Sequence, residues 1–61
     1  MSAEEFAVKI NGLIWQQIII AKGMEAENQQ RERNGEAQAW PAKEFFECAN
    51  EIGRLTELLK G

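Results

Sequence analysis

Apolar residues recur at steps of three and four along two stretches of this chain, and the only proline, Pro41, lies between the stretches. This spacing keeps apolar side chains on one face of a helix. No alternation typical of a strand competes with it. In a heptad that begins at residue 3, the first stretch has Ala3, Ile10 and Met24 at a, Phe6, Leu13 and Ile20 at d, and Ala7, Ile14 and Ala21 at e. The second stretch comprises Phe45, Cys48, Ala49, Ile52, Leu55, Thr56 and Leu59.

Signals for helix ends bracket both stretches. Ser2 and Glu5 form the Ser-x-x-Glu capping box that starts a helix. Asn34 and Gly35 supply the left-handed residue that commonly ends one, and Pro41 suits the first turn of another. We therefore predict one domain, with a helix over about 3–33, a connection over about 34–40 and a helix over about 41–60. Joined by a short connection, the two helices should pack as an antiparallel hairpin, an all-α fold.

The second half of the first predicted helix has two possible forms. Gly23, which follows Lys22, could instead end a shorter helix; we expect a continuous or kinked helix. Beyond Met24 the apolar stripe fades into polar residues, which predicts a solvated extension supported by a Glu27–Arg31 pair at i, i+4.

The small size of the chain favours self-association. A chain of 61 residues with one cysteine and no histidine has neither an intrachain disulfide nor a zinc site to supplement a small core. Large apolar residues also lie off the seam between the two helices, where an exposed patch would mark an interface. We predict a dimer of hairpins, a four-helix bundle, whose interface contains Val8, Trp15, Ile18, Ile19 and Phe46.

Trp40 and two arginines are the candidate residues for binding a partner. Trp40 lies in the connection, where an aromatic side chain either anchors a partner or caps the end of the bundle. Arg31 and Arg33 are either a contact surface or an ordinary charge pattern at a helix end. We assign all three to partner binding and keep these alternatives open.

The remaining candidate residues have structural interpretations. Cys48 is expected to be a small buried hydrophobe. Gln17 is either a seam-edge residue or a buried amide that fixes register across an interface. Glu44, Glu47 and Glu51 share one helix face, which is either solvated, an acidic docking face or a cation site. Because histidine, aspartate and tyrosine are absent, we predict no enzymatic activity, no metal and no cofactor.

The opening segment MSAEEFAVKINGLIWQQIIIAKGMEAENQQ and the hairpin plan resemble the short, acidic, all-helical accessory proteins from early regions of lambda-like temperate phages. The resemblance implies a regulatory or host-directed role through protein contacts. It carries over no functional residue.

These features together predict a non-catalytic protein–protein interaction module, a small homodimeric adaptor or regulator. The net charge of −3 disfavours nucleic acid, and a dimeric hairpin that binds DNA or RNA is the alternative. No targeting signal is visible, and the longest apolar run is too short to cross a bilayer. We therefore expect a cytoplasmic protein without membrane contact.

Overall fold

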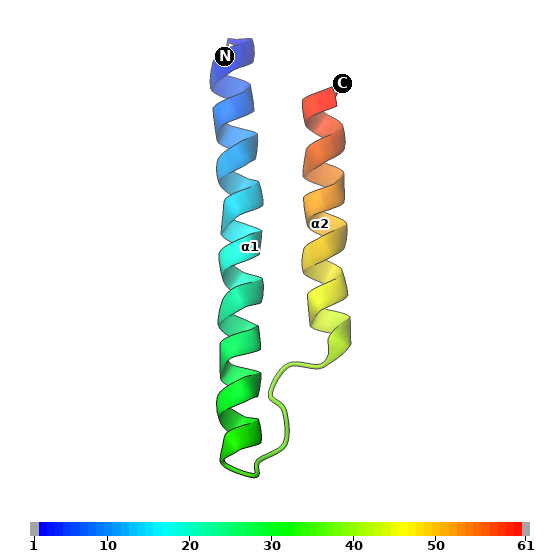
Figure 1. The fold of residues 1–61 in the computed structure, drawn as a ribbon. Helices are drawn as coiled ribbons and strands as arrows, with labels where there is room; N and C mark the ends of the chain where they lie inside the picture. Colours follow the sequence, from blue (N-terminus) through cyan, green and yellow to red (C-terminus); the bar gives the residue numbers. More distant parts are fainter. Residues whose placement is uncertain (1, 61) are drawn as a thin grey trace.

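The structure is a computed structural model that describes residues 2–60, which form two antiparallel helices joined by a loop (Figure 1). Helix α1 spans Ala3–Arg33 and helix α2 spans Ala42–Lys60. The start of α1 and the end of α2 lie at the same end of the hairpin (Figure 1). The predicted all-helical hairpin is therefore confirmed for the described residues.

Both ends of α1 have the capping geometry that the sequence predicts. The N–H of Glu5 donates to Ser2 Oγ at 3.1 Å, which satisfies one of the free donors at the helix start. At the other end, Gly35 has a φ of 74°, and its N–H donates to the carbonyl of Glu32 at 3.1 Å. Between these caps α1 passes through Gly23 without a break.

Helix α2 begins directly after the proline. Pro41 lies just outside the helix, and its carbonyl accepts the N–H of Glu44 at 3.0 Å. Proline suits this place because its ring fixes φ near the helical value and its missing N–H would have no helical acceptor there. The observed start, Ala42, is one residue later than the sequence indicated.

The core is a single seam between the two helices. Helix α1 contributes Ile10, Met24 and Asn28 as buried residues, with Ile14, Gln17 and Ala21 half-buried between them. Helix α2 contributes buried Cys48 and Leu55 with half-buried Phe45 and Ile52. In the heptad that begins at residue 3, the α1 side of the seam is therefore built from the a and e positions.

The apolar stripe predicted for α1 is wider than the surface that one neighbouring helix, α2, can cover. The d positions Phe6, Leu13 and Ile20 lie beside the seam and stay partly exposed. Two helices in contact share one narrow line of side chains, so a second helix covers two of the three apolar heptad positions. The third position is left as surface.

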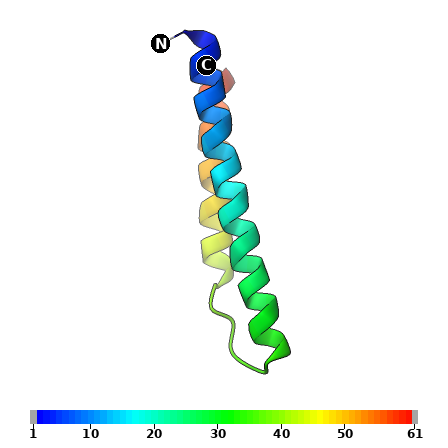
Figure 2. The ribbon, with the colours of Figure 1, turned by 90° about the vertical axis from the view of Figure 1, so that its left-hand side faces the viewer.

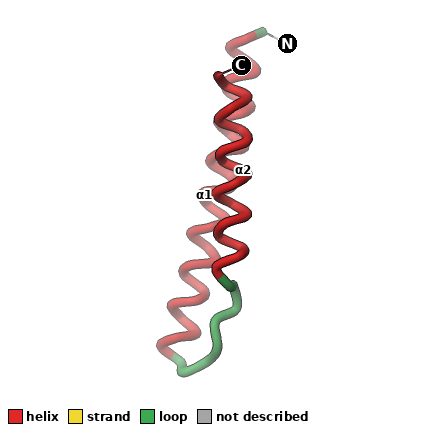
Figure 3. Tube along the Cα trace, turned by 90° about the vertical axis from the view of Figure 1, so that its right-hand side faces the viewer, coloured by secondary structure: helices red, strands yellow, loops and turns green. Residues whose placement is uncertain are grey.

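The hairpin is long and thin. Its principal extents are 50 × 16 × 11 Å, and its radius of gyration is 14.9 Å. A compact domain of this length would have a radius of gyration of about 10.5 Å. Figure 2, viewed from the side of α1, shows α2 lying largely behind α1. Helix α1 extends past the start of α2, and the loop returns along this extension (Figure 3).

Candidate interaction surfaces

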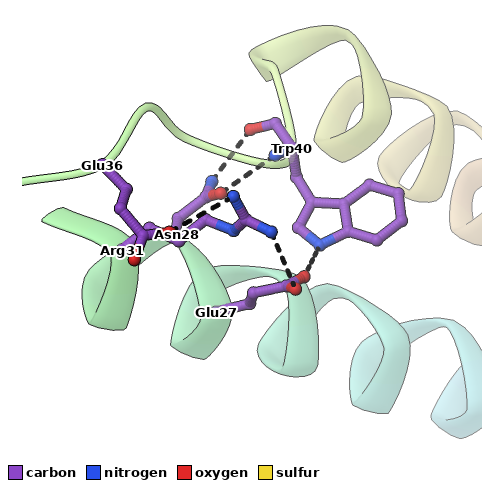
Figure 4. Close-up of polar contacts among 5 residues, drawn as sticks. All are labelled: Glu27, Asn28, Arg31, Glu36 and Trp40. Carbon is purple, nitrogen blue, oxygen red and sulfur yellow. Dashed lines mark hydrogen bonds and ion pairs between the residues drawn. The ribbon is translucent and has the colours of Figure 1, made fainter. Parts of the chain in front are cut away.

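The loop is held to α1 by the side chain of Asn28. The Nδ2 of Asn28 donates to the carbonyl of Trp40 at 2.8 Å, and the N–H of Trp40 donates to Asn28 Oδ1 at 3.0 Å (Figure 4). Asn28 is only 8% exposed. Most residues of the predicted solvated extension beyond Met24 are exposed. Asn28 is the buried exception because the returning loop covers it.

Glu27 and Arg31 add a polar network next to this contact. The Trp40 Nε1–H donates to the carboxylate of Glu27. Arg31 Nη2 lies 3.9 Å from Glu27, as the i, i+4 spacing predicted, and Nη1 lies 3.6 Å from Glu36 in the loop (Figure 4). The arginine thus links the last turns of α1 to the loop.

The three residues assigned to partner binding lie in different surroundings. The indole of Trp40 is partly exposed and bonded to Glu27. Arg31 is half-buried and engaged by two glutamates, whereas Arg33 is exposed at the last turn of α1. Trp40 is therefore held against α1 by Asn28 and Glu27, and 36% of its surface stays exposed. A role of these residues in binding stays a prediction.

A groove of about 420 Å³ opens on one side of the seam, near the loop. We call it the acidic groove. Its floor is apolar and its rim carries carboxylates. It is lined by Ile20, Gly23, Met24 and Glu27 of α1, by Trp40, and by Glu44, Glu47 and Cys48 of α2.

The carboxylates along this side of α2 differ in their partners. Glu51, one turn beyond Glu47, accepts hydrogen bonds from Arg54, including one from Nε at 3.0 Å. This hydrogen bonding lowers the pKa of Glu51 and raises that of Arg54. The ion pairs among residues 2–60 include neither Glu44 nor Glu47. Both carboxylates line the groove. Lys43, one turn before Glu47 on the same helix, is in ion-pair contact with neither.

The other side of the seam has no charged side chain along its central part. A helix turns by about 100° per residue, so Ala49 flanks Cys48 on the side opposite Glu47, and Ile18 lies across the seam from Ile20. Residues 10–21 contain no charged residue, and the charged residues of 45–56 follow the groove side of α2. We call this surface the uncharged face. It comprises Ile14, Ile18, Phe45, Ala49, Ile52 and Thr56.

The five residues predicted for the dimer interface lie on three different parts of the surface. Ile18 lies half-buried in the uncharged face. Val8, Trp15 and Ile19 share the side of α1 that points away from α2, with Trp15 62% and Ile19 66% exposed. Phe46, 66% exposed, lies on the outer side of α2. Trp15 lies three residues before Ile18, and Phe46 lies three residues before Ala49. Each therefore borders the uncharged face on its own helix.

The remaining sequence candidates have plain structural positions. Cys48 is buried in the seam, as expected for a small hydrophobe, and part of it reaches the floor of the acidic groove. Gln17 is half-buried on the α1 side of the seam. No cluster of three or more side chains with metal-binding atoms occurs within residues 2–60.

Sequence reasoning missed the roles of Asn28 and of the uncharged face. Asn28 continues the seam four residues after Met24, at the spacing that should have marked it. Residues 10–21 contain no charged residue, and this run was the sequence signal for the uncharged face.

No protein-family model, curated protein or solved structure matches this chain. Neither helix of the described chain combines the length and the apolar character needed to cross a bilayer. What the protein does is therefore inferred from its own surfaces.

Proposed function

We propose that this protein is a non-catalytic protein–protein interaction module that acts as a homodimer, a small adaptor or regulator. The single observation that carries the proposal is its surface area. The hairpin exposes 4767 Å². A folded monomer of its 6.9 kDa would expose about 4000 Å². The excess is close to the roughly 800 Å² that each partner buries in a stable interface.

The uncharged face is the surface that best suits a second copy. Both helices contribute to it, so two hairpins related by a two-fold axis would place four helices around a common core. Its central side chains are apolar or small, so two faces in contact would bury no charge at their centre. Lys22 and Glu25, one and two turns after Ile18, would lie at the rim of the contact. Trp15 and Phe46, at its borders, would lose part of their exposed area in the same dimer.

Charge supports this choice of face. Burying Glu44 and Glu47 of the acidic groove against a second acidic chain would remove two carboxylates from water without a matched cation, which costs several kcal/mol per ion by order of magnitude. With the uncharged face buried, these carboxylates stay in solvent.

A nucleic-acid-binding role has less support. Phosphate binding needs available cations, and Arg31 is already held between Glu27 and Glu36. A dimer would also carry twice the chain's net charge of −3, which repels phosphate at long range. Phage origin and a cytoplasmic location stay predictions from sequence.

Sedimentation equilibrium at low micromolar concentration tests the dimer. We expect about twice the mass of one chain. Ala49→Glu should give a monomer because it places a charge at the centre of the uncharged face. Gln16→Glu adds the same charge at an exposed position of α1, one turn before Ile20 on the groove side, and should leave the dimer intact. A folded wild-type monomer, or an Ala49→Glu variant that remains dimeric, would contradict the proposal.

A further inference from the structure

The acidic groove combines two features that call for one kind of occupant. Its floor offers apolar atoms of Ile20, Met24 and Cys48, with the Trp40 indole also lining it. Its rim offers the carboxylates of Glu44 and Glu47, which lie at i, i+3 on α2 and take part in no ion pair within residues 2–60. A ligand that satisfies both must carry an apolar group and positive charge together.

We propose that the acidic groove binds a basic amphipathic helix of another protein. An apolar side chain of that helix would enter the groove, and lysine or arginine side chains one turn apart would meet Glu44 and Glu47. The inference rests on the proposed role as an interaction module and names the class of partner.

The size and aromatic wall of the groove fit this occupant. Its volume of about 420 Å³ falls within the range of about 300–1,000 Å³ that is typical of ligand pockets. The hydrogen bond from Trp40 Nε1 to Glu27 and the main-chain bonds to Asn28 hold the tryptophan in place. A cation over the face of a fixed indole gains attraction from the ring as well as from the carboxylates.

A second copy of the chain is a poorer occupant of this groove. Arg31, Arg54 and Lys60 already contact glutamates of their own hairpin. Lys9, Lys22, Arg33 and Lys43 form no ion pair within residues 2–60, but a second copy carries a net charge of −3 and so brings more negative than positive charge to the groove. The uncharged face, on the other side of the seam, serves a second copy without burying carboxylates. The groove of each hairpin therefore stays open in the proposed dimer.

The test uses Trp40 as the reporter in a Trp15→Phe background, where it is the only tryptophan. The probe is a synthetic amphipathic helical peptide of leucine and lysine. The same peptide with glutamate in place of lysine is the control. We expect saturable change in Trp40 fluorescence with the lysine peptide and none with the glutamate peptide. The absence of a change with the lysine peptide would overturn the inference.

Matched variants locate the binding. Glu44→Gln with Glu47→Gln should weaken binding of the lysine peptide about three- to tenfold, as expected for the loss of two partly exposed charge pairs. Glu32→Gln with Glu57→Gln changes the net charge equally away from the groove and should leave the affinity within about twofold. Equal weakening by both pairs would mean general attraction to an acidic protein and would overturn the inference.

Neighbouring isoleucines provide a second test. Ile20 lines the groove, whereas Ile19 points away from it. Ile20→Ser should weaken peptide binding, and Ile19→Ser should not. If Trp40 fluorescence instead changes on dilution of the protein without peptide, a second copy occupies the groove and the inference fails.

Sedimentation equilibrium on the same samples separates this inference from the homodimer. A dimer that does not bind the lysine peptide would overturn the groove assignment alone. A monomer that binds it through Glu44 and Glu47 would overturn the homodimer alone.

Discussion

The carboxamide of Asn28 hydrogen-bonds both main-chain groups of Trp40, its N–H at 3.0 Å and its carbonyl at 2.8 Å. An amide side chain suits this contact because it carries a donor and an acceptor on one planar group. The pair of bonds lets the chain leave α1, run back along it and enter α2 at a fixed position.

Asn28→Ala should destabilise the hairpin by about 2 kcal/mol, because two partly buried main-chain groups of Trp40 lose their partners. Urea unfolding followed by circular dichroism, at one fixed protein concentration, measures the change in the free energy of unfolding. Fixed concentration matters because dimerisation would add to the apparent stability.

The matched control for this change is Gln29→Ala. Gln29 is the next residue along α1, is exposed, and bonds only within its helix, from Nε2 to Glu25 at 3.4 Å. Its replacement should shift stability by less than about 0.5 kcal/mol. Equal effects of the two substitutions would show that the contact between Asn28 and Trp40 does not hold the loop.

The helices and their ends could be predicted from sequence because the signals are local. The capping bond from Glu5 to Ser2 and the left-handed Gly35 depend on residues a few positions apart. The steps of three and four fix one face of each helix in the same way. Local signals of this kind leave few alternative positions for the helices and their ends.

The sequence could not predict which apolar residues of α1 form the seam, because this depends on where α2 packs. Phe6, Leu13 and Ile20 are as apolar as the residues that were buried, and nothing near them in sequence marks them as surface. The same holds for the acidic groove. Glu47 and Ile20 lie 27 positions apart in the sequence and meet at one groove only through the packing of two helices.

Gly12 and Gly35 should respond in opposite ways to replacement by alanine. A Cβ at Gly12 would meet no other atom within 4 Å, so Gly12→Ala should stabilise the hairpin by about 1 kcal/mol through helix propensity. Gly35 has a φ of 74°, so Gly35→Ala should destabilise it by about 1 kcal/mol. Thermal unfolding of both variants at equal concentration measures the difference.

The outcome at Gly12 also reports on its surroundings in solution. Gly12→Ala that lowers stability would mean that another chain packs against this side of α1. Gly35→Ala that leaves stability unchanged would contradict the left-handed end of the helix.

The ion pair between Glu51 and Arg54 should give a small, pH-dependent contribution to stability. Hydrogen bonding to the guanidinium holds the pKa of Glu51 below its ordinary range. A carboxyl with a lowered folded-state pKa stabilises the fold at pH values above its unfolded-state pKa. That contribution is lost as the pH falls through the lower, folded-state pKa.

Arg54→Gln should therefore raise the pKa of Glu51 towards its ordinary range, as measured by a ¹³C NMR titration of the side-chain carboxyl. The melting temperature of the wild-type protein should exceed that of the variant by a small margin near neutral pH, because the pair lies at the surface, with the Arg54 and Glu51 side chains 60% and 36% exposed. The margin should vanish in acid, where Glu51 is protonated in both proteins, and shrink at high salt, which screens the pair. An unchanged pKa of Glu51 in the variant would show that Arg54 does not engage it in solution.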